Sequence, residues 1–264
     1  MSTRGRARVL VRRALGCALV LAVALAGAPC GVHAEPGPAA ATDVLPLPSR
    51  RAVLAFAAGS TAAIALCAAN DARWSRALAA SGGDGARDAA RVAKQFGNHL
   101  AVAPALLAVD AGARLAGRPR LAAATERVAL SCASAGLVTL ALKNAAGRWR
   151  PHEDADPRRF EPFSGHDSFP SGHTTMAFSL AGALDAETRS HWVPAIAYPL
   201  AAATGWSRVH DHVHWPSDVA AGAAIGTGVA FATDRWAQRA LPAGVAAAIW
   251  PARGGAVARV RTRF

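Results

Sequence analysis

KNAAGRWRP at residues 143–151, SFPSGH at residues 168–173 and SRVHDHVHWPSD at residues 207–218 are three polar clusters in a sequence otherwise rich in alanine, leucine, valine and glycine. Apolar segments long enough to form helices surround them and separate the second cluster from the third. Because a polar stretch between two apolar helices lies at helix ends, we expect all three clusters in loops and helix termini. This arrangement predicts one active site built from three loops.

Six apolar segments are predicted as helices, and the alternation of β-branched and polar residues that marks strands is scarce. The predicted fold class is therefore all-α, a helical bundle of about six core helices with the active site at the helix ends. A more polar interval at residues 70–97 is predicted to hold a short surface helix. The six segments are Ala52–Ala69, His99–Leu115, Leu121–Leu142, Thr174–Glu187, Trp192–Trp206 and Asp218–Ala232.

The composition bounds the function classes. Apolar residues make up 52% of the 264 residues and charged residues 17%, which fits one domain with a sizeable core. The net charge of +12 is concentrated near the two termini, so we expect no nucleic-acid partner, and no feature indicates an oligomeric state. Cys67 and Cys132 lie in predicted helices, where two buried thiols are expected and a disulfide is the alternative in an oxidising compartment.

Residues 1–34 have the pattern of a secretory signal, with a basic start, an apolar middle and small residues at 32 and 34. The same pattern also fits an uncleaved anchor helix. Residues 35–50 are rich in proline and alanine and are predicted as a linker. Residues 51–240 are predicted as the catalytic domain and residues 241–264 as a basic tail.

Two apolar segments approach the roughly 20 residues that a bilayer requires, Ala52–Ala69 and Leu121–Leu142. If all six segments and the N-terminal segment crossed a membrane, alternation of direction would place the Lys143 and Asp218 clusters in the cytoplasm. A site that faces the periplasm requires that one early segment does not span, or that the cleaved protein is largely soluble. We expect an inner-membrane protein with its site toward the periplasm, or a soluble periplasmic protein after signal cleavage.

Three cationic side chains suit a phosphoryl group, whose non-bridging oxygens carry negative charge. Arg150 and Arg208 can each engage two oxygens through a planar fork, and Lys143 acts as a compact point charge. Taken alone, Lys143 is better explained as a charge that complements the C-terminal dipole of a helix.

The second cluster precedes a predicted helix, for which Ser171 is a natural N-cap. The same helix start points free backbone N–H groups outward, and Gly172 lets an anion approach the backbone closely. His173 is placed beside this cradle, where it can give a proton to a leaving oxygen.

In the third cluster, His214 and Asp218 are four residues apart, one helical turn. A carboxylate bonded to one imidazole nitrogen leaves the other nitrogen free as a nucleophile. In isolation, the pair is better explained as a loop histidine and an acid at a helix N-terminus. A zinc site formed by His210, His212 and His214 is a further interpretation, but it leaves the other two clusters without a role.

Together the three clusters resemble the signature motifs of the type 2 phosphatidic acid phosphatase superfamily, which also includes bacterial non-specific acid phosphatases and vanadium haloperoxidases. Six residues separate Lys143 from the pair Arg150-Pro151, and PSGH follows at residues 170–173. In the third motif, five residues separate Arg208 from His214, and three residues separate His214 from Asp218. Every fixed position is filled in the right order, and the resemblance covers about residues 52–232.

The resemblance implies a helical bundle and a phosphohistidine mechanism without a metal or other cofactor. His214 would attack phosphorus, with Asp218 holding its imidazole. His173 would protonate the leaving group and then activate water. The phosphoryl oxygens would be bound by Lys143, Arg150, Ser171, the Gly172 backbone and Arg208.

We therefore predict a bacterial envelope phosphatase that hydrolyses phosphomonoesters or pyrophosphates, with a phosphorylated lipid as the expected substrate and a membrane as the expected environment. Two alternatives stay open: a vanadate-dependent haloperoxidase that uses the same site, and a non-catalytic membrane-embedded helical protein whose basic loops bind anionic headgroups. Trp149, Phe160, Phe163 and Trp215 flank the clusters and are interpreted either as an apolar substrate entrance or as packing residues.

Overall fold

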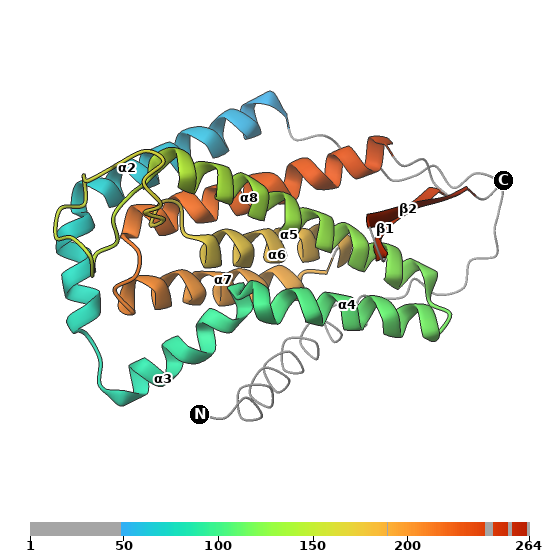
Figure 1. Cartoon of the computed structure of the whole chain (residues 1–264), viewed down its shortest axis with the longest axis horizontal. Helices are drawn as coiled ribbons and strands as arrows, with labels where there is room; N and C mark the ends of the chain where they lie inside the picture. The colour runs from blue at the N-terminus through green and yellow to red at the C-terminus, as the bar shows by residue number, and fades with distance from the viewer. Residues whose placement is uncertain (1–48, 189, 241–244, 253–254, 263–264) are drawn as a thin grey trace.

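A computed structural model of the chain describes residues 49–188, 190–240, 245–252 and 255–262. Its long helices lie side by side as an elongated bundle, with their axes mostly along the long direction of the molecule (Figure 1). The described helices are α2 (Arg50–Ala80), α3 (Asp84–Ala93), α4 (His99–Leu115), α5 (Pro119–Ala146), α6 (Gly172–Thr188), α7 (Trp192–His210) and α8 (Pro216–Ala240), together with the short 3-10 helix η1 (Lys94–Gly97).

The predicted all-α bundle is confirmed, and each of the six predicted segments falls within or nearly coincides with one helix. The segment at 99–115 has the predicted bounds, whereas α2 continues well past Ala69 to Ala80. Helix α3 and η1 account for the short surface helix expected in the interval 70–97. Helix α5 ends at Gly147, whose φ of 55° is the left-handed conformation that glycine adopts readily at a helix C-terminus.

Helix α6 lies at the centre of the bundle, and apolar side chains from its neighbours pack around it (Figure 1). Leu180 and Leu184 share a core cluster with residues of α4, α5 and α7. On another side of α6, alanines at 177 and 181 pack against alanines of α7. Because α6 is buried on nearly all sides, the catalytic cluster at its start is held by several helices at once.

Glycines allow α8 to approach the first turns of α6 very closely. A Cβ atom on Gly226 would lie 2.4 Å from the carbonyl oxygen of Thr175, and one on Gly222 would lie 2.8 Å from that of Ser171. No side chain fits at these distances, so only glycine permits this packing. The starts of α6 and α8, which carry parts of two polar clusters, are thereby placed next to each other.

The stretch predicted as a basic tail contains an antiparallel hairpin formed by β1 (Val245–Ala252) and β2 (Gly255–Thr262), with Val245 opposite Thr262. The sequence did not indicate these strands, because their alanines and glycines have weak strand propensity. The helical fold class therefore holds for residues 50–240, and the hairpin is an addition outside the bundle.

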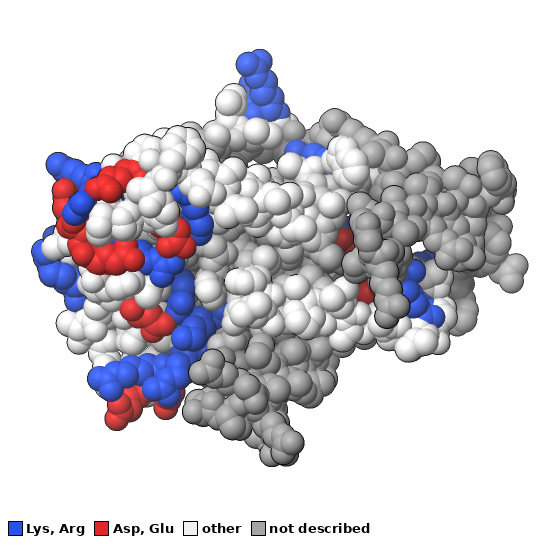
Figure 2. Space-filling model, viewed as in Figure 1, with Lys and Arg blue, Asp and Glu red and all other residues white. Residues whose placement is uncertain are grey.

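Two described helices, α2 and α5, are long and apolar enough to cross a bilayer, judged by length and composition alone. None of the apolar window of α2 is buried, compared with 28% of that of α5. On the face shown in Figure 2, charged residues gather over one end of the bundle, and the middle of the described surface carries almost no charge. This distribution fits a bundle whose uncharged middle lies in a membrane.

Two predictions made near the N-terminus fall on residues that the structure leaves out. The signal at residues 1–34 and positions 35–48 of the linker lie outside the described residues.

Cys67 on α2 and Cys132 on α5 are both free thiols, and Cys132 is buried as predicted, whereas Cys67 is partly exposed.

Candidate active site

The three polar clusters meet at one end of the bundle. Consecutive long helices run in opposite directions, so the end of α5, the start of α6, the end of α7 and the start of α8 lie on the same side. Figure 1 shows the long loop between α5 and α6 at this end, beside the second half of α2. The prediction that three loops gather in one place therefore agrees with the arrangement of the helices.

A pocket of about 380 Å³ opens at this end. Five of the predicted site residues line it: Lys143, Arg150, Gly172, His173 and His214. Its remaining lining residues are His99, Gly136, Thr139, Leu140, Asp167, Thr175 and Met176. The cationic and imidazole groups therefore share one cavity with apolar side chains from α5 and α6.

Lys143 and Arg150 are held together by Asp167, a residue that the sequence analysis did not select. Arg150 donates two hydrogen bonds to the Asp167 carboxylate, at 2.9 and 3.0 Å, and the Lys143 Nζ atom lies 3.6 Å from the same group. The Lys143 ammonium also donates to the Asp167 carbonyl oxygen. Partial burial opposes ionisation of Asp167, but the positive charges of Lys143 and Arg150 outweigh it and lower its pKa. Asp167 is therefore an ionised carboxylate bound to the cations that a phosphate would need.

His214 and Asp218 are neighbours, as their spacing predicted. The His214 Nδ1 atom lies 3.6 Å from Asp218 Oδ2, slightly beyond a hydrogen bond, and has no hydrogen-bond partner among the described residues. Asp218 is held in place by the Ser168 hydroxyl at 2.6 Å and by the backbone N–H of Trp215 at 2.9 Å. This arrangement places the Asp218 carboxylate on the Nδ1 side of the His214 imidazole, while the ring lines the pocket.

Burial lowers the pKa of His214, because a desolvated imidazolium is disfavoured, and the Asp218 carboxylate opposes this effect only in part. The imidazole is therefore neutral near pH 7. A neutral imidazole with a carboxylate on one nitrogen is the state that a nucleophilic histidine requires.

Ser171 and Arg208 lie close to the pocket but do not line it. Ser171 is buried, its backbone N–H donates to the Asp218 carbonyl oxygen at 3.0 Å, and its hydroxyl accepts from Thr174 at 3.0 Å. Arg208 is nearly buried and paired with Asp211, which Lys94 also approaches at 3.6 Å.

Two further charged residues behind Asp218 were missed by the sequence analysis. Arg148 donates from one guanidinium nitrogen to Asp218 and from another to Asp71 of α2, at 2.5 and 2.7 Å. Arg148 belongs to the first cluster, but its spacing carried no signal that separated it from a surface arginine. Asp71 is a lone acid in a long apolar helix, which is the only sequence signal that marks it.

The histidines considered for zinc lie in three different environments. The His210 ring packs against Trp206 in a tilted arrangement, with 5.1 Å between ring centroids, and His212 Nδ1 lies 3.2 Å from the Ser75 hydroxyl. Only His214 of the three lines the pocket. Among the described residues, no group of three or more histidine, cysteine, aspartate or glutamate side chains is arranged to hold a metal ion.

The four aromatic residues that flank the clusters are outside the described lining of the pocket. Trp215 is buried and donates through Nε1 to the Trp149 carbonyl oxygen at 2.9 Å, which is a packing role. Phe160 and Phe163 are exposed on the loop between α5 and α6.

Comparisons with known proteins show what part of this chain is similar to. Residues 126–242 match the PAP2 superfamily. A lipid A 1-phosphatase of Porphyromonas gingivalis is 39% identical over a region that covers 37% of this chain and 20% of that protein. A probable diacylglycerol pyrophosphate phosphatase of Schizosaccharomyces pombe is 34% identical over 38% of this chain and 48% of that protein. The chain thus spans less than half the length of either relative.

The fold has a match among solved structures. A transmembrane PAP2-type phosphatidylglycerolphosphate phosphatase from Bacillus subtilis superposes with a TM-score of 0.57 at 20% sequence identity, covering 70% of this chain and 96% of that one. At this identity the likeness concerns the fold alone. It agrees with the helical bundle described above.

Proposed function

We propose, on the premise that residues 126–242 of this chain are a PAP2 superfamily domain, that the protein is a phosphatase that acts on a phosphorylated lipid through a phosphohistidine intermediate. The observation that carries the proposal is the pocket in which His214, His173, Lys143 and Arg150 converge. We place the catalytic domain at residues 51–240, which includes every residue assigned a role below.

In the proposed mechanism, His214 attacks phosphorus with its free imidazole nitrogen, and the bond between phosphorus and the leaving oxygen breaks. His173 gives a proton to that oxygen, and Asp218 stabilises the positive charge that develops on His214. A water molecule then attacks the phosphohistidine, His173 takes its proton, and the bond from phosphorus to nitrogen breaks to release phosphate.

Lys143, Arg150 and the backbone N–H groups at Gly172 bind the phosphoryl oxygens and stabilise their charge in the transition state. Gly172 faces Lys143 directly, because a Cβ atom at position 172 would lie 3.7 Å from Lys143 Cε. Arg208 and Ser171 complete the phosphate site if Arg208 exchanges Asp211 for the phosphate. All of this chemistry uses side chains and backbone groups of the protein, so the proposal expects activity without an added metal.

A lipid substrate is supported by what surrounds the pocket. The pocket extends along α5 from Lys143 to Gly136, two turns or about 10 Å toward the uncharged middle of the bundle. Leu140 lines it and is also 58% exposed on the outer surface of α5, and Leu137 beside it is 69% exposed. An acyl chain lying in the membrane could reach the phosphate site along this wall. The named activities of the two relatives, both on lipid phosphates, agree with this substrate class.

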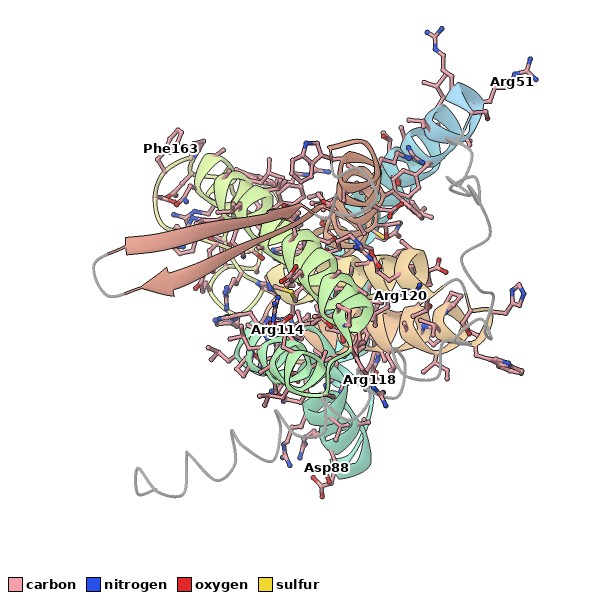
Figure 3. All side chains as sticks on the ribbon, turned by 90° about the vertical axis from the view of Figure 1, so that its right-hand side faces the viewer. Arg51, Asp88, Arg114, Arg118, Arg120 and Phe163 are labelled. Carbon is pink, nitrogen blue, oxygen red and sulfur yellow. The ribbon has the colours of Figure 1, made fainter. Side chains whose placement is uncertain are left out.

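We also propose that the protein lies in the inner membrane with the site toward the periplasm. The arginines at the start of α2 and around the turn between α4 and α5 then lie in the cytoplasm, as positive charge favours (Figure 3). Figure 3 looks onto this end, where Arg114, Arg118 and Arg120 cluster. Arg114 is itself paired with Asp110 at 2.8 Å and with Glu126, so the excess positive charge at this end comes from Arg118 and Arg120.

The test is phosphate release by the purified protein in detergent, in excess EDTA, from one long-chain lipid phosphate and one soluble aryl phosphate. We expect His214→Ala to lose at least about a thousandfold in rate, because covalent catalysis has no substitute nucleophile. The matched control is His212→Ala, which removes a histidine of the same loop that lies outside the pocket.

The outcomes separate the candidate functions. Activity that survives EDTA and His212→Ala but not His214→Ala supports the phosphohistidine mechanism. Loss of activity in EDTA or in His212→Ala would instead support a histidine metal site. Absence of phosphate release from both substrates would contradict the proposal and favour the haloperoxidase or the non-catalytic protein.

A further inference from the structure

Helix α2 docks onto the bundle through polar residues, although most of its surface is apolar. Within this helix, only Asp71 and Ser75 are buried, at 1% and 0% exposure. They are four residues apart and therefore lie on one face of the helix, one turn from each other. The two fully buried side chains of this long apolar helix are therefore both polar, which marks this point of α2 as a specific contact.

The contacts of Asp71 lead to the start of α8. One Asp71 oxygen accepts the backbone N–H of Ser217 at 2.8 Å, and the other accepts the Ser217 hydroxyl at 2.6 Å. Ser217 is the second residue of α8, so its N–H has no partner within that helix. Asp71 therefore acts as an N-cap supplied by another helix, and its negative charge is favourable at a helix N-terminus.

Asp71 is also joined to Asp218 through Arg148. One nitrogen of the Arg148 guanidinium donates to Asp71. Another donates to Asp218 and, at 2.7 Å, to the hydroxyl of Ser217. The three charged side chains are all at most 3% exposed. A buried charge is tolerated only when an opposite charge pairs with it. Removing the charge of Asp71 would therefore leave the charges of Arg148 and Asp218 without their full complement. The position and charge of Asp218, and through it of His214, thus depend on Asp71.

We infer that Asp71 is a positioning residue for catalysis: it holds Arg148 and the start of α8 so that Asp218 faces His214. This inference rests on the proposed phosphatase function. It assigns a role to a residue outside the matched region 126–242 and makes α2 part of the active site. Asp71 does not line the pocket, so its effect reaches the reaction only through Arg148, Ser217 and Asp218.

The test compares Asp71→Asn with the wild type in detergent, measuring kcat, the inhibition constant of inorganic phosphate, and the pH profile of kcat/KM. Asparagine keeps an acceptor for the Ser217 N–H but removes the charge that balances Arg148. We expect kcat to fall by about tenfold to a hundredfold, by analogy with the residues that orient metal-binding histidines. The phosphate inhibition constant should stay within about twofold, because Lys143 and Arg150 do not contact Asp71.

The pH profile separates positioning from general loss of structure. Removing a negative charge near His214 disfavours its imidazolium, so the acid limb of kcat/KM should move to lower pH. The matched control is Ser75→Ala, which removes the other buried contact of α2 and should leave kcat and the limb unchanged. If Asp71→Asn does not fold, Arg148→Lys replaces it, because lysine cannot pair two carboxylates as a planar fork does.

Wild-type kcat and an unmoved acid limb in Asp71→Asn would overturn the inference. It would also be overturned if Ser75→Ala lost as much activity, because both residues would then act only through docking of α2. Failure of the proposed function gives a different result, since the wild type itself would then release no phosphate.

Discussion

At the residue scale, Asp167 pairs with the two cations, Lys143 and Arg150, that are proposed to bind phosphate. Its carboxylate is bound to Arg150 and faces Lys143, and its lowered pKa keeps it ionised well below neutral pH. A phosphate dianion that enters the pocket must compete with this carboxylate or lie beside it. On the proposed function, we therefore expect Asp167 to weaken phosphate binding and to favour release of the product.

We expect Asp167→Asn to lower the inhibition constant of inorganic phosphate by about tenfold, or about 1.4 kcal/mol of binding free energy. The pKa of Asp167 lies below its usual value, so the carboxylate is ionised and the difference should persist from about pH 5 to about pH 8. The difference should shrink only as pH falls through that lowered pKa, where wild-type Asp167 gains a proton and resembles asparagine.

Glu161→Gln is the matched control for this measurement. It removes the same charge from the same loop, at a residue that pairs with Arg159 outside the pocket. An equal gain in phosphate affinity from both substitutions would mean that only the overall charge of the loop matters. An unchanged inhibition constant in Asp167→Asn would show that its carboxylate does not compete with phosphate.

At the scale of elements, α5 combines two roles that its sequence does not separate. Its last turn supplies Lys143 to the phosphate site, and its middle forms the wall along which an acyl chain is proposed to lie. Gly136 lies on that wall, and a Cβ atom added there would meet nothing within 4 Å. A larger side chain at this position would therefore fill the pocket without disturbing the packing of the bundle.

We expect Gly136→Leu to lower kcat/KM for the long-chain lipid phosphate by about tenfold or more, because leucine occupies the path of the chain. Hydrolysis of the soluble aryl phosphate should change by less than about threefold, because the phosphate site is two turns away. Gly112→Leu is the control, since Gly112 on α4 also has open space around it but lies outside the pocket. Equal loss on both substrates would refute the assignment of this wall.

At the scale of the whole molecule, the direction of α2 determines on which side of a membrane residue 49 lies relative to the active site. Helix α2 starts away from the pocket, about midway along the bundle in Figure 1, and contacts the site near its own C-terminal end, through Asp71. If α2 spans the membrane, residue 49 and the active site lie on opposite sides. A signal cleaved after Ala34 would leave the new N-terminus outside and the site inside. The proposed periplasmic site therefore requires that residues 35–49 stay in the cytoplasm.

This topology predicts the labelling of single cysteines by a membrane-impermeant thiol reagent on intact cells. In a background without the native cysteines, Arg158→Cys on the site loop should be labelled, and Arg118→Cys at the turn between α4 and α5 only after the cells are broken. Both arginines are exposed, so the pair is matched. The purified protein should also retain residues 1–34 by intact mass. The reversed labelling pattern would place the site in the cytoplasm.

The helices and the reactive side chains were determined by the sequence itself. Apolar composition along each segment and the spacing within each polar cluster are local properties, so helix α4 could be bounded to the residue, and His214 could be paired with Asp218 across one turn. The three motifs also carried the resemblance to a family and, with it, the proposed reaction class. The hairpin of β1 and β2 escaped prediction, because its pairing depends on backbone contacts that its alanine-rich residues do not signal.

Only the tertiary structure decided which charges meet. Asp71 and Arg148 are 77 residues apart, and no local pattern indicates that they form a buried pair behind Asp218. Likewise, the binding of Asp167 to Arg150 and the pairing of Arg208 with Asp211 depend on how the loops are packed at the end of the bundle. The physical reason is that a helix is specified by neighbours within a few residues, whereas an ion pair between helices is specified by the packing that brings them together.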